Sequence, residues 1–181
     1  MTYRARQILM PQLAEHQSVS ADMVVPLIAW RGEVERGWID TNDHMTSMAY
    51  PALFHPKIAT LFHLVGINLD YITQRRLSVF QREFRLAYER ELRLGDRIEI
   101  RSWLIDHDEK RIHHFHELWN TEKNYRASYV EYMTFHIDMG ARRTGPFPPE
   151  VMDRLDALAA AFARVPAPKG VGQTIGIPRK G

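Results

Sequence analysis

The spacing of apolar residues between positions 49 and 65 predicts a helix. Apolar side chains recur there at steps of three and four, which places them on one helical face, and Gly66 is suited to a left-handed position at the helix end. Pro51 fits the first turn. Pro56 lies deeper in the segment, where proline removes a backbone hydrogen bond, and it predicts a short or bent start.

After residue 76 the period of the apolar positions changes from that of a helix to that of a strand. Polar turns divide this region into four segments, which predicts four consecutive antiparallel strands. An earlier strand is expected within residues 24–36, with Pro26 at its start or on a sheet edge. A closing helix follows, with Pro149 in its first turn. In the last of the four strands, alternation places one set of side chains on a common face: Ala127, Tyr129, Met133, Phe135 and Ile137.

The order of these elements predicts the fold class. A strand, one long helix and a four-stranded meander are typical of an α+β domain in which a curved antiparallel β-sheet wraps around one long central α-helix, because the helix covers the apolar face of the sheet. We expect an N-terminal extension over residues 1–23, the domain with its closing helix over 24–163, and a tail over 164–181. The tail is too rich in glycine and proline to pack by itself and is interpreted as a tail or docking arm.

Composition narrows the class of protein. The chain has 181 residues, 45% of them hydrophobic, which is enough for a single domain with its own core. It has no cysteine, which excludes disulfides, thiol nucleophiles and thiolate metal sites and favours a cytoplasmic location. No apolar run approaches the roughly 20 residues of a membrane span, and the apolar patch at 8–10 is too short for a signal peptide. We therefore expect no membrane association.

The positive net charge of +2 does not indicate a nucleic-acid partner. Four of the 24 basic residues lie in the last 18 positions, which leaves 20 basic against 22 acidic residues in the rest of the chain. The body of the protein therefore has no global basic field. The four residues are Arg164, Lys169, Arg179 and Lys180.

Polar side chains are concentrated in WIDTNDHMTSMAY, residues 38–50, directly before the predicted helix. One interpretation is a solvated turn that caps the helix, because Asp, Asn, Thr and Ser accept hydrogen bonds from the free N–H groups of a first turn. The other is a catalytic carboxylate, Asp40, held against the positive end of the helix. The residues of this segment alone leave both interpretations open.

The segment resembles the W-x-D-x-N-G-H-M-x-x-x-x-Y signature of hotdog-fold thioesterases related to 4-hydroxybenzoyl-CoA thioesterase, particularly those that hydrolyse small acyl-CoA thioesters, including betainyl-CoA. The resemblance continues through LRLGDRIEIRSWLIDHDEKRIHHFHEL and HIDMGARRTGPFPPEVMDRL and covers about residues 24–157. It implies a homodimer or homotetramer with active sites at a subunit interface and Asp40 as the catalytic group. The substrate-binding residues expected around it are Trp38, Asn42, His44, Met45 and Tyr50.

The implied reaction is hydrolysis of an acyl-CoA thioester to a free acid and CoA. The carbonyl carbon needs an attacking water or carboxylate, and the developing oxyanion needs hydrogen-bond donors, whereas a thiolate leaves with little protonation. Asp40 would act as general base or nucleophile, with backbone N–H groups around residues 44–48 polarising the carbonyl. Both roles stay open. His44 either holds the loop by hydrogen bonds or contacts the thioester.

The chain departs from the signature where a glycine usually precedes the histidine. Asp43 stands there, with a side chain and a negative charge at a position where the signature's glycine permits a positive φ. Aspartate tolerates that conformation better than most residues. The acyl group is not determined. Trp30, Trp38 and Tyr50 are candidates to hold a trimethylammonium head by cation–π attraction, but aromatic residues beside a buried helix are more often core.

Two basic pairs at predicted strand ends are candidates for binding the phosphates of CoA: Lys110–Arg111 and Arg142–Arg143. Ordinary solvated turns would explain these pairs equally well. The chain has neither a P-loop nor a dinucleotide-binding glycine fingerprint, so no cofactor is expected beyond the CoA part of the substrate.

Several histidines raise the possibility of a metal site. Alternation places only His114 and His116 on one strand face, which supplies two of the three or four ligands that a metal needs. We therefore expect no metal and interpret the histidines as polar side chains on the solvent side of a half-exposed sheet. The complete set is His107, His113, His114, His116 and His136.

Two other functions are compatible with the same fold. Hotdog-fold hydratases add water to an enoyl-CoA and use the spacing D-x-x-x-x-H, whereas Asp40 and His44 are one residue closer. A non-catalytic acyl-CoA-binding protein is the third hypothesis, favoured by Asp43. Binding without turnover would distinguish it from an enzyme.

Overall fold

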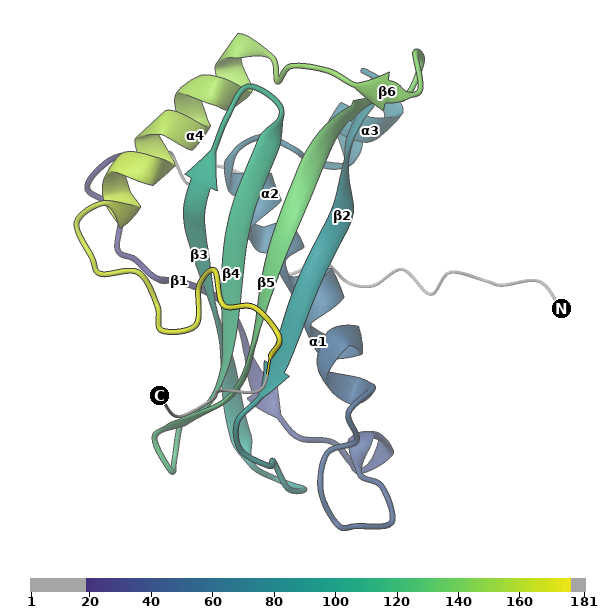
Figure 1. The fold of residues 1–181 in the computed structure, drawn as a ribbon, viewed down its shortest axis with the longest axis vertical. Helices are drawn as coiled ribbons and strands as arrows, with labels where there is room; N and C mark the ends of the chain where they lie inside the picture. Colours follow the sequence, from purple (N-terminus) through teal and green to yellow (C-terminus); the bar gives the residue numbers. More distant parts are fainter. Residues whose placement is uncertain (1–18, 177–181) are drawn as a thin grey trace, which may run out of the picture.

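The computed structural model describes residues 19–176, so most of the N-terminal extension expected over 1–23 lies outside the described residues. One antiparallel sheet has the strand order β1-β3-β4-β5-β2, and the short β6 pairs with the end of β5 (Figure 1). The strands are β1 (Leu27–Glu33), β2 (Leu77–Tyr88), β3 (Arg97–His107), β4 (Arg111–Asn120), β5 (Tyr125–Asp138) and β6 (Arg143–Thr144).

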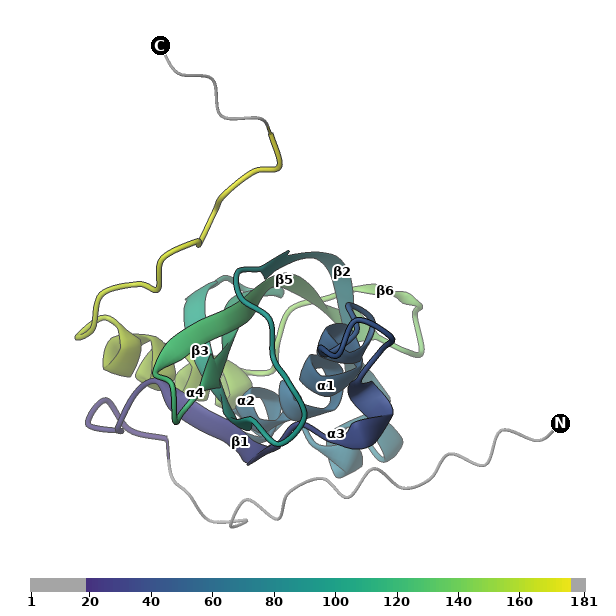
Figure 2. The same ribbon diagram turned by 90° about the horizontal axis from the view of Figure 1, so that it is seen from below.

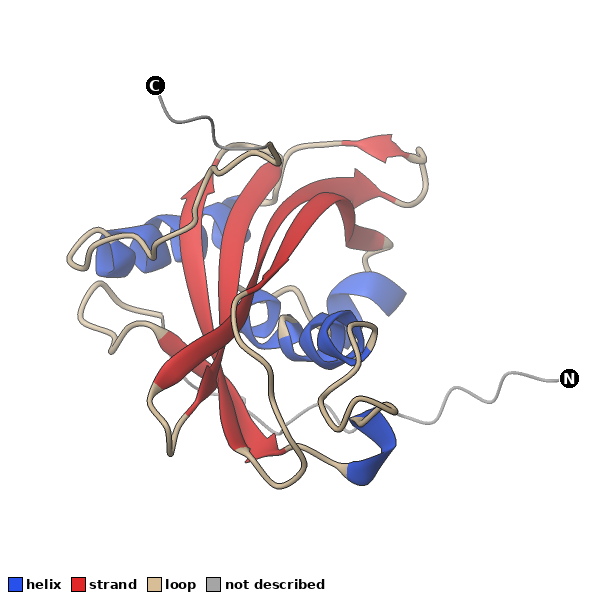
Figure 3. Ribbon diagram, turned by 60° about the horizontal axis from the view of Figure 1, so that its bottom comes forward, coloured by secondary structure: helices blue, strands red, loops and turns tan. Residues whose placement is uncertain are grey.

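The sheet curves around helices on its concave side, as Figures 2 and 3 show. The predicted α+β arrangement is therefore confirmed. No helix within residues 19–176 is both long and apolar enough to cross a bilayer. The helices are α1 (Ala49–Lys57), α2 (Ala59–Leu64), α3 (Leu69–Thr73) and α4 (Pro149–Phe162), and a 3-10 turn, η1, spans Arg36–Trp38.

The central helix predicted over 49–65 exists as two pieces, α1 and α2, divided at Ile58. The division follows Pro56 by two residues, because a proline inside a helix cannot donate its backbone hydrogen bond. After α2 the chain turns at Gly66, whose φ of +88° is the left-handed conformation expected there. Both the bend and the end of this helix thus follow from single residues.

The core lies between this helix and the inner face of the sheet. Phe54, Ile58 and Leu61 of the helical region are almost completely buried, and Ile98 and Ile100 of β3 face them as part of the same cluster. Burial of such side chains stabilises a fold by about 1.5–3 kcal/mol each. The helix therefore anchors the curved sheet.

The helices contact the face of β5 opposite to the one that carries Met133 and Phe135. Met133 and Phe135 are half-buried, whereas the intervening Tyr132 and Thr134 are buried on the side of the helices. The position of Tyr132 follows from its stacking on His114, which in turn contacts Phe62 of α2. Alternation identified the two faces of this strand but not which of them meets the helix.

The expectation that the histidines lie on the solvent side is wrong for three of them. His114, His116 and His136 are buried. The first two form a chain across the inner face: Ser102 Oγ to His116 Nδ1 (2.7 Å), His116 Nε2 to His114 Nδ1 (2.6 Å), and His114 Nε2 to Thr134 Oγ1 (2.8 Å). A neutral imidazole both donates and accepts, so this chain satisfies every ring nitrogen. Among the described residues no cluster of three or more possible ligands could hold a metal.

Acid should destabilise the fold through this buried chain. Burial lowers the pKa of His116 to about 3 and that of His114 well below its usual value, whereas both titrate near 6.5 when unfolded. Their contribution to the free energy of unfolding is complete above pH 6.5, and it is lost as the pH falls from 6.5 toward 3. The free energy of unfolding, measured with denaturant, should fall by about 2 kcal/mol per neutral histidine between pH 7.5 and 5.0. An equal fall in a His116→Gln variant would contradict this origin.

Candidate active site

The polar segment of residues 38–48 forms a closed loop between η1 and α1. Its two ends meet at an isolated antiparallel bridge between Ile39 and Met45. Three further backbone hydrogen bonds close the loop: Asp40 N to His44 O (3.1 Å), Asp43 N to Asp40 O (3.2 Å) and Thr46 N to Trp38 O (2.8 Å). The loop therefore holds Asp40 at a defined place in the segment that leads into α1.

Asp43 has a φ of +60°, in the left-handed region. The family signature has glycine at this position, and the conformation shows why: a residue without Cβ adopts it at no steric cost. Aspartate is among the few other residues that adopt it singly. The loop thus keeps the backbone geometry expected from the signature although its residue differs.

The side chain of Asp40 is 29% exposed and is held within the loop. Its Oδ1 accepts a hydrogen bond from Asn42 N at 2.8 Å, and His44 Nδ1 lies 3.9 Å from the same oxygen. Asp40 does not cap α1: the cap position is Met48, and no side chain makes a capping bond there. The structure therefore brings Asp40 and His44 together without using the carboxylate to cap the helix.

The other candidate residues of this segment divide into two groups. Asn42 is exposed and His44 is partly exposed, so both are accessible beside Asp40. Met45 and Tyr50 are buried, and burial raises the pKa of Tyr50 to about 12. Trp38 is half-buried and packs against the core. The loop is thus supported on its core side by Met45, Tyr50 and Trp38.

A second loop, residues 89–96, holds the first in place, which sequence reasoning missed. Leu92 O accepts a hydrogen bond from Met45 N at 2.7 Å. Tyr88, at the end of β2, donates from its hydroxyl to Ser47 O at 3.0 Å, and its ring meets that of Tyr50 edge-on at 5.1 Å. The one sequence signal for this role of Tyr88 is its position at the end of a strand, next to a charged loop.

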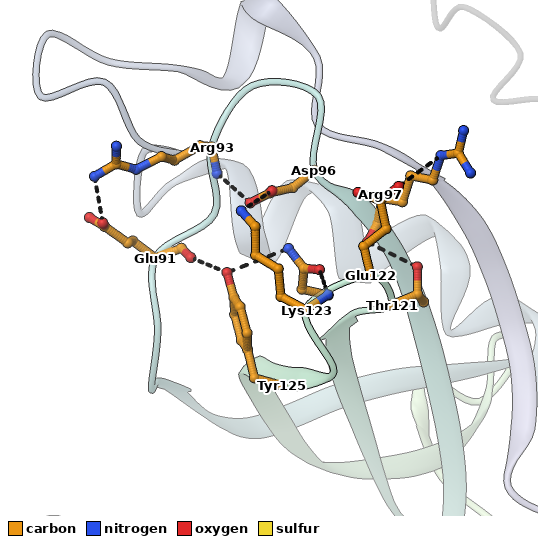
Figure 4. A network of polar contacts seen from close by, with 9 residues as sticks. Glu91, Arg93, Asp96, Arg97, Thr121, Glu122, Lys123 and Tyr125 are labelled. Atoms are coloured by element: carbon orange, nitrogen blue, oxygen red, sulfur yellow. Dashed lines mark hydrogen bonds and ion pairs between the residues drawn. The ribbon is translucent and has the colours of Figure 1, made fainter.

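The 89–96 loop is itself fixed by a polar network with the β4–β5 turn (Figure 4). Asp96 accepts from Lys123 Nζ at 2.6 Å and from Arg93 N at 2.9 Å, while Tyr125 Oη donates to Glu91 O at 2.8 Å. Burial by itself would raise the pKa of Asp96, but these hydrogen bonds bring it below its usual value. The carboxylate therefore stays charged and keeps the loop closed.

The basic pairs proposed for CoA lie at the opposite end of the sheet from Asp40 in the same chain. Lys110 and Arg111 stand at the β3–β4 turn, and Arg142 and Arg143 at the β5–β6 turn, whereas the Asp40 loop contacts the other ends of these strands. The length of β4 implies a separation on the order of 30 Å. Arg111 also pairs with Asp108, and Lys110 with Glu109. One chain alone does not bring the proposed CoA residues to Asp40.

An apolar groove of about 470 Å³ runs between the helical region and β2. β2 is an edge strand that pairs only with β5, and three of its aromatic residues are exposed: Phe80 by 46%, Phe84 by 56% and Tyr88 by 52%. The groove is lined by His55, Ile58, Ala59, Phe62, Val79, Phe80 and Gln81.

A curved sheet around a central helix, with an aspartate loop before that helix, defines the hotdog class of thioesterases. The chain matches the Thioesterase-like superfamily over residues 34–155 and belongs to it. The fold class and the thioesterase resemblance inferred from the signature are thereby confirmed.

Characterised relatives agree with this assignment. The chain is 33% identical over 141 residues to a betainyl-CoA thioesterase of Pseudomonas aeruginosa, covering 78% of this chain and 89% of that protein. It is 31% identical over 159 residues to an L-carnitine dehydrogenase/betainyl-CoA thioesterase of Rhizobium meliloti, covering 88% of this chain but 32% of that longer protein.

A solved structure has the same fold. A Staphylococcus aureus protein determined in complex with CoA superimposes with a TM-score of 0.75 at 25% identity, covering 87% of this chain and 99% of that one. The fold is therefore shared with a protein that was solved in complex with CoA.

Proposed function

We propose that this protein hydrolyses acyl-CoA thioesters with small acyl groups and that Asp40 is its catalytic carboxylate. The single observation that carries the proposal is the loop geometry: a partly exposed aspartate is held in a closed loop that leads into α1, and the side chain of the cap residue Met48 makes no capping bond. The superfamily match and the relatives support the same reaction. A cytoplasmic location remains a prediction from the absence of cysteine.

The geometry suits attack on a thioester. Asp40 Oδ1 is engaged by Asn42 N, which orients the carboxylate so that Oδ2 can take a proton from water or attack the carbonyl carbon itself. The positive end of α1 would stabilise the oxyanion that develops. The thiolate of CoA then leaves as the carbonyl re-forms, without needing an acid. Where Asp40 is the nucleophile, this step leaves an acyl–aspartyl anhydride, which water hydrolyses to the free acid and the Asp40 carboxylate.

Asp40→Asn should abolish turnover with little effect on folding. Asparagine keeps the oxygen that accepts from Asn42 N but has no charge, so the free energy of unfolding should change by about 1 kcal/mol or less while kcat falls by orders of magnitude. Free-thiol release and denaturant unfolding measure the two quantities. Asp43→Asn is the matched control, since it removes a neighbouring charge at a position that asparagine also tolerates, and it should keep most activity. Parallel loss of stability and turnover in Asp40→Asn would make Asp40 structural.

We further propose that the protein forms dimers through β2. A long edge strand with exposed aromatic residues is prone to pair with another chain, and two-fold pairing of β2 edges is antiparallel. The β5–β6 turn neighbours the start of β2, because Leu77 pairs with Asp138. Antiparallel pairing would bring this turn, with Arg142 and Arg143, toward the other subunit's Tyr88 and its Asp40 loop. A composite site would then bind CoA.

This arrangement predicts complementation between two defective variants. Asp40→Asn subunits and Arg142→Ala/Arg143→Ala subunits should each have low activity at limiting substrate concentration. After mixing and subunit exchange, half the dimers are mixed and each has one intact site, so about a quarter of wild-type activity should return. Light scattering should give a dimeric or tetrameric mass. A monomeric mass, or no recovery after verified exchange, would contradict the composite site.

A cationic acyl group is the most specific form of the proposal. The relative from Pseudomonas aeruginosa is a betainyl-CoA thioesterase. Tyr50 is buried and Trp30 already has Lys57 Nζ 5.2 Å from its ring centroid. Tyr88, whose hydroxyl binds Ser47 O, is instead an exposed aromatic surface at the loop, and it is suited to a trimethylammonium head.

Betainyl-CoA should be preferred to butyryl-CoA, a neutral chain of similar length. A cation–π contribution of roughly 1.4 kcal/mol corresponds to a tenfold higher kcat/KM. Tyr88→Leu and Tyr88→Phe both lose the hydroxyl bond to Ser47 O, so any slowing that they share reports that bond. Tyr88→Leu should remove the preference for betainyl-CoA, whereas Tyr88→Phe, which keeps the ring, should retain it. Equal kcat/KM for both substrates in the wild-type protein would leave a general short-chain thioesterase. Hydration of crotonyl-CoA, or binding of thioesters without thiol release, would instead favour the hydratase or the binding protein.

A further inference from the structure

The segment that follows α4 lies across the outer face of the sheet, on the side away from α1 and α2 (Figures 1 and 2). Its residues 169–173 cover Tyr129 of β5, which is only 3% exposed although it belongs to the outer face. Glycine and proline prevent regular structure in this segment but not binding to the sheet. The segment occupies a defined place on that face.

Four side chains of the sheet hold this segment, three of them through its backbone. Hydrogen bonds to backbone groups fix the path of a segment independently of its own side chains. The bonds are Arg126 Nη1 to Lys169 O (2.7 Å), Arg85 Nη2 to Gly170 O (3.0 Å), Gly172 N to Glu131 Oε1 (2.9 Å) and Tyr129 Oη to Gln173 Oε1 (3.1 Å).

Gly170 has no room for a side chain on this path, whereas Gly172 does. Both have positive φ, +111° and +70°. A Cβ at Gly170 would lie 2.7 Å from Tyr129 Cζ, closer than non-bonded carbons approach, while a Cβ at Gly172 would meet nothing within 4 Å. A side chain at either position adds the strain of a left-handed backbone, but only a side chain at Gly170 also disturbs the contact between the segment and the sheet.

Arg126 connects the segment to the loop that supports the candidate active site. Its Nε and Nη2 donate to the two carboxylate oxygens of Glu89 at 2.8 and 2.7 Å, and Nη1 also reaches Glu117 at 2.7 Å. The hydrogen bond from Arg126 is the main reason why the pKa of Glu89 lies below its usual value. Glu89 directly follows Tyr88, whose hydroxyl binds Ser47 O. A continuous set of contacts thus runs from Lys169 to the Asp40 loop.

We propose that residues 169–173 are a brace for the active site: by holding Arg126 they fix Glu89, and through it Tyr88 and the 89–96 loop against the Asp40 loop. Arg126 is then a positioning residue on the far side of the sheet from the chemistry. The structural part of this proposal is independent of the reaction, and only its kinetic consequence rests on the proposed thioesterase function.

Hydrogen exchange of the full-length chain tests the brace directly. In Gly170→Val, amide exchange should increase several-fold in residues 165–176 and also in 88–96 and 40–48, while β3 and β4 stay protected. Gly172→Ala, the matched control, adds left-handed strain without the clash and should leave exchange in 88–96 and 40–48 as in the wild type. Gly170→Ala is the milder variant if valine prevents folding. Faster exchange confined to 165–176, or unchanged exchange throughout, would overturn the proposal.

Glu89→Gln tests whether Arg126 is the link. It weakens the ion pair between Arg126 and residue 89 without a direct contact to residues 169–173, so 88–96 and 40–48 should exchange faster than in the wild type. Unchanged exchange in 88–96 and 40–48 would overturn the proposal. With acyl-CoA, Gly170→Val should raise KM more than it lowers kcat, since Asp40 itself is unchanged. If the wild type hydrolyses no thioester, the proposed function fails while the exchange comparison still decides the brace.

Discussion

Burial of the bent helix α1–α2 against the concave face of the sheet is the interaction on which the other features depend. Phe54 and Leu61 are completely buried there, and the strands curve so that their inner side chains surround the helix. Because α1 is fixed by its own packing, its first turn and the preceding loop have a fixed position. The position of Asp40 therefore depends on the packing of α1 as well as on the loop that carries this residue.

The sheet is covered on both faces, by different means. Inside, the helix and a chain of neutral histidines fill the concave surface, and the histidines satisfy one another's hydrogen bonds. Outside, residues 169–173 cover Tyr129, and three other side chains of the sheet engage their backbone groups. The segment lies on the outer face of the sheet, away from the helix. Arg126 nevertheless links it to Glu89, which directly follows the last residue of β2. The outer covering thus contributes order to the end of the sheet where Asp40 lies.

The two ends of the sheet carry different parts of the proposed chemistry. Asp40 lies at one end, and the basic residues at the β5–β6 turn lie at the other. The exposed aromatic residues of β2 run along the open edge between them. An antiparallel partner on this edge would reverse the order and bring the ends of two chains together. This geometry gives a physical reason why an enzyme of this shape would act as an oligomer.

Local rules in the sequence determined the elements and much of the site. The bend after Pro56, the turn at Gly66 and the positive φ at Asp43 depend on single residues and their neighbours, and the signature around Asp40 identified the fold. Only the tertiary structure decided which face of β5 meets the helix, because both faces carry aromatic or apolar residues and alternation is symmetric between them. It likewise decided that His114 and His116 are buried, because their partners Ser102 and Thr134 come from other strands. The binding of the glycine-rich segment to the sheet was also decided by the tertiary structure, because Arg126 and Tyr129 precede their partners in that segment by some 40 residues.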